Sequence, residues 1–322
     1  MSSAESFLSE WIGRSGPVTF HEFMEAALYH PEFGYYRRAR DPFGREGDFY
    51  TAEQLQPVFG ILIAARIRSL FEEMGRPPDF RVVELGAGRG EMAKELSSFH
   101  YVSVEIGDPM PERFTGVVFS NEFFDALPVH VAVRRGTSWN EMRISRRDQC
   151  FAWEECGEAP EEVRRYLDRY AGSPEEGNLC EANLDALRWL EEIAARLERG
   201  YVFTIDYGYT ARELIRFPHG TLMSYHRHTA AENVLTGAGE RDITAHVNFT
   251  ALRDHGERSS LETIRFESLA RTLLDAGEAD QFAAALSSGG EAERMRRTLQ
   301  LKTLLYGMGE TFRTLLQKKA AK

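Results

Sequence analysis

Apolar residues recur along the chain in two patterns, as short β-branched runs and as longer stretches at helical spacing. Short runs are typical of buried parallel strands, and the longer stretches indicate helices between them. The runs predict strands at residues 81–85, 101–105, 116–120, 201–205 and 263–267. Helical spacing and helix-forming composition predict helices at residues 20–29, 58–74, 91–96, 159–170, 183–197 and 268–322. Together these elements predict an α/β fold with a doubly wound, mostly parallel sheet.

Residues 129–153 follow a different pattern, in which apolar and polar positions alternate. Alternation is typical of antiparallel strands with one buried face, and turns are expected at 135–136 and 147–148. We therefore expect an insertion in the parallel sheet. The expected domains are an N-terminal helical arm at 1–78, a sheet domain at 79–134 and 181–267, inserted strands and a helix at 135–180, and a C-terminal helical region at 268–322.

A glycine-rich turn between the first two predicted strands points to a ligand. Gly86, Gly88 and Gly90 have the spacing G-x-G-x-G, which lets the chain turn sharply and bring its backbone close to a ligand. Glu84 stands before them, where a carboxylate would repel a pyrophosphate and suit a cationic amino group. Glu105 ends the second strand, where it can accept hydrogen bonds from both hydroxyls of a ribose. The pattern favours S-adenosylmethionine, with a dinucleotide and a turn without any ligand as the alternatives.

Polar residues also follow two further buried strands. Asn121, Glu122 and Asp125 come directly after the third strand, and Asp206 and Tyr207 follow the fourth. Residues at such positions lie at the ligand-binding edge of a parallel sheet. Asn121, Glu122 and Asp125 are therefore our candidates for the chemistry. The alternative is that Glu122 and Asp125 cap the N-terminus of a following helix.

Two loops carry further candidates for a substrate pocket, Tyr36 in an aromatic segment and His246 in a polar cluster. Loop residues of this kind can line a pocket, although the aromatic segment could equally pack the N-terminal arm onto the core. The pairs His226/His228 and His246/Asn248 resemble metal ligands only in type. Neither pair has a third ligand at a recognised spacing, so we expect no metal.

Composition narrows the function classes. The 322 residues carry a formal net charge of -11, which argues against wide contact with nucleic acid but not against a basic protein segment as substrate. Three cysteines without C-x-x-C spacing indicate reduced thiols rather than a disulfide framework or a zinc site. No apolar run approaches the roughly 18 residues of a membrane-spanning helix, and the N-terminus shows neither a signal-peptide core nor an Arg-rich transit pattern. We therefore expect a cytoplasmic protein that does not insert into a membrane.

Several stretches together resemble the MidA-type methyltransferases, a family that includes the mitochondrial complex I assembly factor that methylates arginine. They span most of the chain in order: FMEAALYHPEFGYY (23–36), GDFYTA (47–52), ELGAGRG (84–90), NEFFDALPV (121–129), IDYGY (205–209), GERDITAHVNF (239–249) and MGETF (308–312). The resemblance implies a class I methyltransferase fold with an additional substrate-recognition region. It also implies S-adenosylmethionine as the donor and, for some members, arginine side chains of a respiratory-complex subunit as the acceptor.

The resemblance assigns roles by position. The glycine turn falls on the donor-binding loop, and Glu105 falls on the acid that binds the ribose. Asn121, Glu122 and Asp125 fall on the strand-end motif beside the reaction centre, with Asn121 also near the donor. An arginine acceptor needs carboxylates, because they bind a guanidinium as a planar fork. We hypothesise that Glu122 binds and polarises this cation.

Further residues would complete the predicted acceptor site. Asp125 or Asp206 would hold the second edge of the guanidinium. His246 would take the released proton. Tyr207 and Tyr36 would line the rest of the substrate pocket.

Two departures from the family pattern keep other functions open. Only residues 106–120 separate Glu105 from Asn121, which is too short for the helix, strand and loops that the family has there. Residues 52–54 also differ from the usual motif. The short segment admits a non-catalytic assembly or binding protein on the same fold. A small-molecule methyltransferase is the other alternative, because a fold does not dictate its acceptor.

Overall fold

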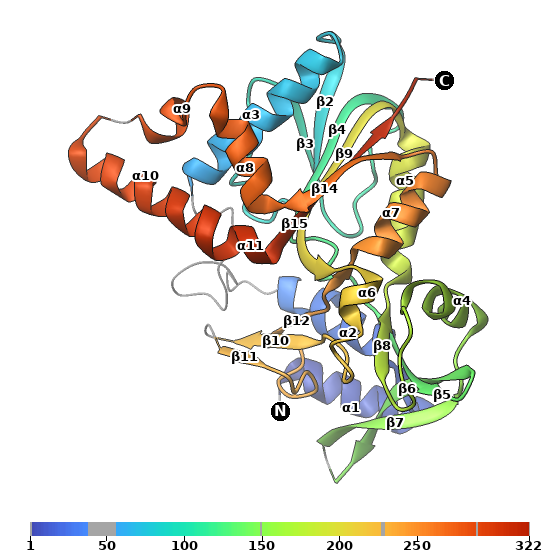
Figure 1. Ribbon diagram of the computed structural model, residues 1–322. Helices are drawn as coiled ribbons and strands as arrows, with labels where there is room; N and C mark the ends of the chain where they lie inside the picture. The colour runs from blue at the N-terminus through green and yellow to red at the C-terminus, as the bar shows by residue number, and fades with distance from the viewer. Residues whose placement is uncertain (1, 38–55, 149, 227–228, 288, 322) are drawn as a thin grey trace. The chain divides into compact units, whose positions relative to one another are not determined.

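The computed structural model describes residues 2–37, 56–148, 150–226, 229–287 and 289–321 (Figure 1). The chain divides into two compact units, each built from three segments. The first unit contains Met1–Tyr50, Phe124–Leu187 and Tyr209–Ala251. The second unit contains Thr51–Phe123, Arg188–Gly208 and Leu252–Lys322.

A mostly parallel sheet forms the centre of the second unit, with strands in the order β14-β15-β9-β4-β2-β3. Neighbours among β9, β4, β2 and β3 pair in parallel, β15 pairs antiparallel with β9, and β14 pairs antiparallel with β15. The strands are β2 (Phe80–Leu85), β3 (His100–Val104), β4 (Phe114–Asn121), β9 (Leu197–Tyr209), β14 (Glu262–Ser268) and β15 (Phe312–Lys319). Val82, Val117 and Phe203 are buried in this sheet, as a strand covered on both faces requires. The predicted α/β class is confirmed.

Helices cover both faces of this sheet (Figure 1). One face carries α3 (Val58–Glu73), α8 (Leu269–Glu278) and α10 (Glu291–Thr303), and the other carries α5 (Leu184–Arg196) and α7 (Phe249–Arg258). Ile63, Ile67 and Leu70 recur at helical spacing on α3 and are fully buried in one core with Phe119 of β4. The shorter elements of this unit are α9 (Ala283–Leu286), a π-helix (Leu304–Met308) and α11 (Gly309–Thr311).

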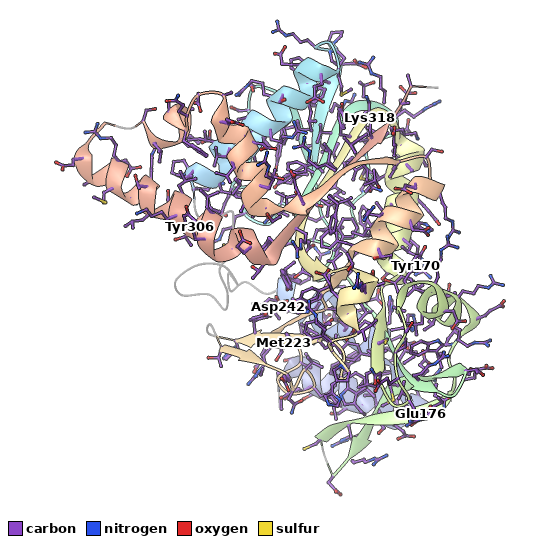
Figure 2. The ribbon with its side chains drawn as sticks, in the orientation of Figure 1. Tyr170, Glu176, Met223, Asp242, Tyr306 and Lys318 are labelled. Atoms are coloured by element: carbon purple, nitrogen blue, oxygen red, sulfur yellow. The ribbon has the colours of Figure 1, made fainter. Side chains whose placement is uncertain are left out.

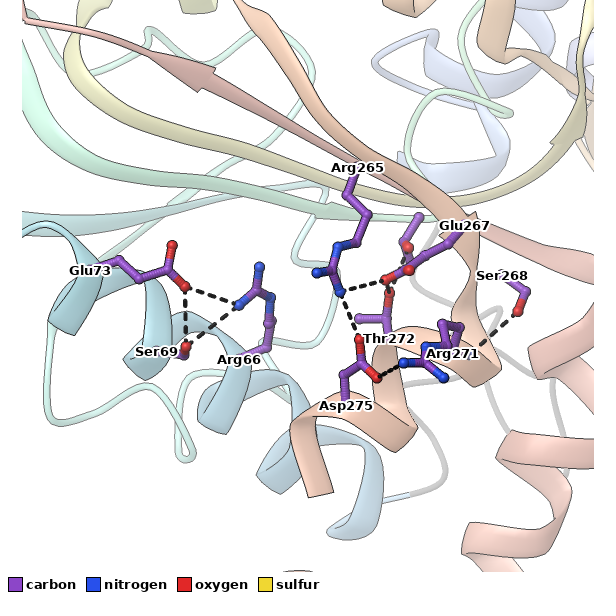
Figure 3. A network of polar contacts seen from close by, with 10 residues as sticks. Arg66, Ser69, Glu73, Arg265, Glu267, Ser268, Arg271, Thr272 and Asp275 are labelled. Atoms are coloured by element: carbon purple, nitrogen blue, oxygen red, sulfur yellow. Dashed lines mark hydrogen bonds and ion pairs between the residues drawn. The ribbon is translucent and has the colours of Figure 1, made fainter. Parts of the chain in front are cut away.

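A polar network joins β14 to α8 (Figure 3). Arg265 Nη1 lies 2.6 Å from Asp275 Oδ2 and 3.6 Å from Glu267 Oε1. Thr272 Oγ1 donates a hydrogen bond to Glu267 Oε1 at 2.8 Å. Ion pairs exposed to solvent contribute roughly 0–1 kcal/mol to folding. The apolar core beneath the network therefore carries most of the stability of this packing.

The first unit contains an antiparallel sheet in the order β1-β6-β5-β8, with β7 paired to β6. Its strands are β1 (Val18–Thr19), β5 (His130–Arg135), β6 (Ser138–Arg147), β7 (Cys150–Glu158) and β8 (Leu179–Ala182). The alternation seen in the sequence therefore corresponds to three antiparallel strands. A smaller sheet has the order β11-β10-β12, with β10 (Met223–His226), β11 (Thr229–Ala231) and β12 (Asp242–Thr244).

Short helices complete the first unit. They are α1 (Ser3–Ser15), α2 (Phe20–Tyr29), a 3-10 helix (Tyr35–Arg37), α4 (Glu161–Tyr170) and α6 (Ala211–Leu214), and β13 (Val247–Asn248) follows them. The start of α2 is a capping box, in which the Glu22 amide donates to Thr19 Oγ1 and the Thr19 amide donates to Glu22 Oε2. This is the helix start that the sequence predicts.

Two predicted helices are wrong. Residues 88–98 form successive turns rather than a helix at 91–96. The segment is short and begins with two glycines in three residues, Gly88 and Gly90, and so short a helix is marginal without strong support. The predicted all-helical region 268–322 ends instead in β15, which lies between β9 and β14. Burial of Leu315 and Leu316 in the sheet overrides the local helical preference.

The two units also differ from the expected domain boundaries. Helix α3 was expected in the N-terminal arm, but its apolar face packs on the sheet of the second unit. The stretch Tyr209–Ala251 was expected in the sheet domain, but it belongs to the first unit. None of the described helices is long and apolar enough to cross a membrane.

Candidate functional site

Parallel pairing brings the carboxyl ends of β2, β3 and β4 to one edge of the sheet in the second unit, beside Ile205 of β9. Leu85 at the end of β2 pairs with Val104 of β3 and with Ser120 of β4. Asn121 at the end of β4 pairs with Ile205 of β9. The residues that follow these positions are therefore neighbours at the edge where open α/β sheets bind ligands.

The glycine turn leaves this edge in a left-handed conformation. The φ angles of Gly86, Gly88 and Gly90 are 66°, 54° and 68°, which other residues adopt with strain. A Cβ atom on Gly86 would lie 2.8 Å from Phe123 Cδ2, so the turn leaves no space for a side chain there. The Gly88 amide donates to Glu105 Oε1 at 3.0 Å. The turn and Glu105 thus form one hydrogen-bonded unit.

Glu84 lies deeper than the sequence suggests. Its side chain is buried, and its Oε2 accepts a hydrogen bond from the Tyr101 hydroxyl at 2.5 Å. The carboxylate therefore faces β3 within the sheet. Contact between Glu84 and a ligand stays a prediction.

Asn121 and Glu122 form the most unusual part of this edge. Glu122 has φ 53°, a left-handed conformation that is uncommon for a residue with a side chain and that concentrates at functional sites. Its amide donates to the Ile205 carbonyl at 3.0 Å, which holds the backbone in place. Asn121 Nδ2 donates to Glu122 Oε1 at 3.2 Å. Asn121 Oδ1 is buried and has no hydrogen-bond partner among the described residues, so it is available to a donor group of a ligand.

The capping alternative for Glu122 and Asp125 is wrong, because residues 122–129 form turns and irregular backbone and no helix begins there.

On the neighbouring strand, Asp206 is fully buried and its Oδ1 accepts from the Tyr207 amide at 2.9 Å. The Tyr207 ring packs edge-on against Phe312 of β15, with centroids 5.6 Å apart. The sequence places Asp206 after the end of its strand, but β9 continues through it to Tyr209 because Asp206 and Tyr207 pair with β15. Asp206 follows Ile205, the residue that pairs with Asn121.

The remaining candidates lie in the first unit, where Tyr36 is held by a buried carboxylate. The Tyr36 hydroxyl donates to Asp242 Oδ1 at 2.8 Å, and Asp242 is labelled in Figure 2. Burial, and then the nearby Asp242 carboxylate, hold the pKa of Tyr36 well above its usual range. The Asp125 carbonyl accepts from the Ala245 amide at 2.9 Å. Asp242 is a buried polar residue that sequence reasoning did not select, although it lies in the polar stretch that contains His246.

His246 is surrounded by aromatic rings. Its imidazole lies 5.1 Å from the Tyr209 ring and 5.9 Å from the Phe217 ring, measured between centroids. Burial lowers the pKa of the imidazole from its ordinary value of 6.5 to about 4. The ring is therefore neutral at neutral pH.

This burial predicts that acid destabilises the first unit. The unfolded chain takes up a proton at His246 near pH 6.5, but the folded chain does so only near pH 4, so stability falls across this window as pH decreases. Between pH 7.5 and 5.0 we expect His246 to account for a loss of roughly 2 kcal/mol in the free energy of unfolding. Urea unfolding at both pH values measures it.

Two variants identify the source of this loss. His246→Gln should reduce the difference between the two pH values by about that amount, while His219→Gln at an exposed position should leave it unchanged. A His246→Gln protein that loses as much stability on acidification as the wild type would assign the effect to other groups.

Some sequence expectations lie outside the described residues, namely the motif at 47–52, its departure at 52–54, and His228. Within the described ranges, no group of three or more His, Cys, Asp or Glu side chains is placed to hold a metal ion. The candidate residues therefore fall into two sets. The set in the second unit is Glu84, Gly86, Gly88, Gly90, Glu105, Asn121, Glu122, Asp206 and Tyr207, and the set in the first unit is Tyr36, Asp125 and His246.

Comparison with known proteins agrees with a methyltransferase built on this sheet. Residues 97–267 match the model of the S-adenosyl-L-methionine-dependent methyltransferase family Methyltransf_28. The match covers more than half of the chain, and the chain belongs to this family. The protein is accordingly an enzyme that uses S-adenosylmethionine as its cofactor, and the predicted MidA-type family is confirmed.

Individual relatives cover most of the chain. Protein arginine methyltransferase NDUFAF7 homolog, mitochondrial, of Drosophila melanogaster is 28% identical over 76% of this chain and 67% of its own length. Human protein arginine methyltransferase NDUFAF7, mitochondrial, is 25% identical over 94% of this chain and 80% of its own length. A COG1565 superfamily member from Burkholderia thailandensis, solved with S-adenosyl-homocysteine bound, is 28% identical with a TM-score of 0.88, covering 99% of this chain and 92% of that chain.

The predicted cytoplasmic location is contradicted by these relatives. The Drosophila and human proteins are both mitochondrial. The prediction rested on cysteine usage, on the lack of a long apolar run and on the pattern of the N-terminal residues. Reduced thiols are compatible with any reducing compartment, so they do not distinguish the cytoplasm from the others.

Proposed function

We propose that this methyltransferase acts on arginine side chains of a protein, and that the acceptor is a subunit of a respiratory complex. The observation that carries the proposal is the Glu122 carboxylate, which accepts a hydrogen bond from Asn121 Nδ2 at the sheet edge that also carries the glycine turn, beside the buried Asn121 Oδ1, which has no partner within the described ranges. The relatives named as protein arginine methyltransferases support arginine as the acceptor residue. The choice of a respiratory-complex subunit rests on the family resemblance alone.

The donor side of the edge fits S-adenosylmethionine, which supplies an electrophilic methyl group on its sulfonium when bound. Gly86, Gly88 and Gly90 would let the ligand approach the backbone, since none of them carries a side chain. Glu105 would accept hydrogen bonds from the ribose hydroxyls. Asn121 Oδ1 would accept from an amino group of the donor or of the acceptor, which satisfies its buried lone pairs.

The acceptor side needs negative charge that is held in place. Glu122 provides a carboxylate on a backbone fixed by its bond to Ile205, so little reorganisation is needed to bind a guanidinium. Such a pair of charge-assisted hydrogen bonds would orient one nitrogen of the acceptor. Asp206 lies one residue beyond Ile205 and would add the second carboxylate. The roles expected from the sequence for Tyr36, Asp125 and His246, which lie in the first unit, stay predictions.

Label transfer tests the proposal. The purified protein, incubated with methyl-labelled S-adenosylmethionine and a lysate from cells that lack it, should place label in protein, and acid hydrolysis should release the label as methylarginine. Label in protein at another residue would overturn the arginine acceptor. Label confined to the small-molecule fraction would overturn a protein acceptor and favour a small-molecule methyltransferase.

A further inference from the structure

An open groove of about 590 Å³ runs along the two N-terminal helices of the first unit, and none of the residues discussed for catalysis lines it. Phe7 and Trp11 of α1 line one side, and Ala26 and Tyr29 of α2 line the other. The groove combines aromatic surface with carboxylates.

The aromatic surface is partly exposed and held in place. Phe7 is 38% exposed. Its ring lies 6.0 Å from the Trp11 ring and 4.9 Å from the His30 ring. The Tyr29 hydroxyl donates to the Ala126 carbonyl at 2.8 Å, which orients that ring. The exposed faces of such rings attract cations, and a guanidinium stacks on them well.

The charge of the groove is mainly negative. Glu10, Glu22 and Glu25 line it together with one arginine, Arg14, which pairs with Glu10. Within the described residues, the side chain of Glu25 has no hydrogen-bond or ion-pair partner. The lining therefore carries an excess of negative charge beside the aromatic rings, which is complementary to a cationic partner and repels an anionic membrane surface.

We propose that this groove docks a basic, arginine-containing segment of the acceptor protein, away from the arginine that is methylated. The inference rests on the proposed function, because it names the chemistry of the same acceptor. Guanidinium groups of the segment lie on the aromatic faces and pair with Glu25 and Glu22. Binding energy from such a remote segment holds the acceptor while its target arginine reacts.

Fluorescence anisotropy with two short peptides tests the docking. The probe is a fluorescein-labelled octapeptide with three arginines separated by glycines, and its twin carries citrulline, which has a similar shape without the charge. The full-length protein should bind the citrulline peptide about tenfold more weakly, and a Trp11→Leu/Glu25→Gln variant should bind the arginine peptide about tenfold more weakly. Glu32→Gln, an exposed position outside the groove, should bind both peptides as the wild type does.

Equal binding of the two peptides overturns the proposal, and so does unchanged binding by the double variant. If the double variant does not fold, Glu25→Gln alone replaces it, because this position is on the surface of α2. Methyl transfer to lysate protein, measured on the same samples, distinguishes a failure of the docking proposal from a failure of the proposed function. Transfer that persists without selective peptide binding overturns the groove alone. Selective binding by a protein that transfers no label to protein overturns the proposed acceptor and leaves the groove as a site for basic segments.

Discussion

A Glu122→Gln variant should bind the donor product as well as the wild type does and lose catalytic turnover by about a hundredfold to a thousandfold. Glutamine has the same size and can keep the hydrogen bond from Asn121, so the backbone at φ 53° and its bond to Ile205 are preserved. What is lost is the negative charge that binds and orients the guanidinium. Calorimetric titration with S-adenosylhomocysteine and label transfer to protein measure the two quantities separately.

Glu112→Gln is the matched control for this variant, since it removes one exposed carboxylate from the same unit and should change neither quantity. Equal loss of donor binding and turnover in Glu122→Gln would show that Glu122 supports the site as a whole. Full turnover would remove Glu122 from the acceptor site. A drop in turnover alone would fit a charge that acts on the acceptor.

Local patterns were enough to find most of the sheet. The strands β2, β4 and β9 are short apolar runs because they are covered on both faces, and that burial is visible in a single sequence. The alternation over residues 129–153 is equally local, because each strand of an antiparallel sheet has one buried face. Such features depend on neighbouring residues in the chain, so the sequence predicts them well.

Features that depend on distant residues were missed. β15 has Leu315 and Leu316 next to polar residues, and only its place between β9 and β14 makes it a strand. The grouping of Tyr209–Ala251 with the N-terminal segment could not be read from the sequence either, since it depends on contacts between segments far apart in the chain. The buried hydrogen bond from Tyr36 to Asp242 is of the same kind.

The candidate site also has features that local sequence predicts and features that depend on distant residues. The glycine turn, Glu105 and Glu122 were identified because each follows a strand end directly, whereas Asp206 lies inside β9. The left-handed backbone of Glu122 and the burial of Glu84 against Tyr101 could not be identified, because they arise from packing across strands. The candidate residues could therefore be chosen from their positions in the sequence, and the structure adds the contacts and backbone conformation that hold each carboxylate.

A Glu105→Ala variant should weaken binding of S-adenosylhomocysteine by about a hundredfold. The carboxylate has two tasks, because it accepts the Gly88 amide at 3.0 Å and would accept the ribose hydroxyls of the donor. Residues 106–113 connect β3 to β4 without a helix. In the described part of the chain, β3 is an edge strand of the sheet. Fewer groups on that side can share in holding the donor, so Glu105 carries more of the affinity. Calorimetric titration of the folded variant measures the loss.

Glu105→Gln separates the two tasks of this side chain. The amide oxygen of the glutamine can still accept from the Gly88 amide and keep the glycine turn in shape. It binds the ribose hydroxyls without a charge, and charge-assisted hydrogen bonds are about twice as strong as neutral ones. We therefore expect the affinity for S-adenosylhomocysteine to fall by only about tenfold. If Glu105→Ala and Glu105→Gln lose the same affinity for S-adenosylhomocysteine, the negative charge of Glu105 accounts for the whole effect. Wild-type affinity in Glu105→Ala would show that the donor is held elsewhere, and it would remove Glu105 from the donor site while leaving the family assignment intact.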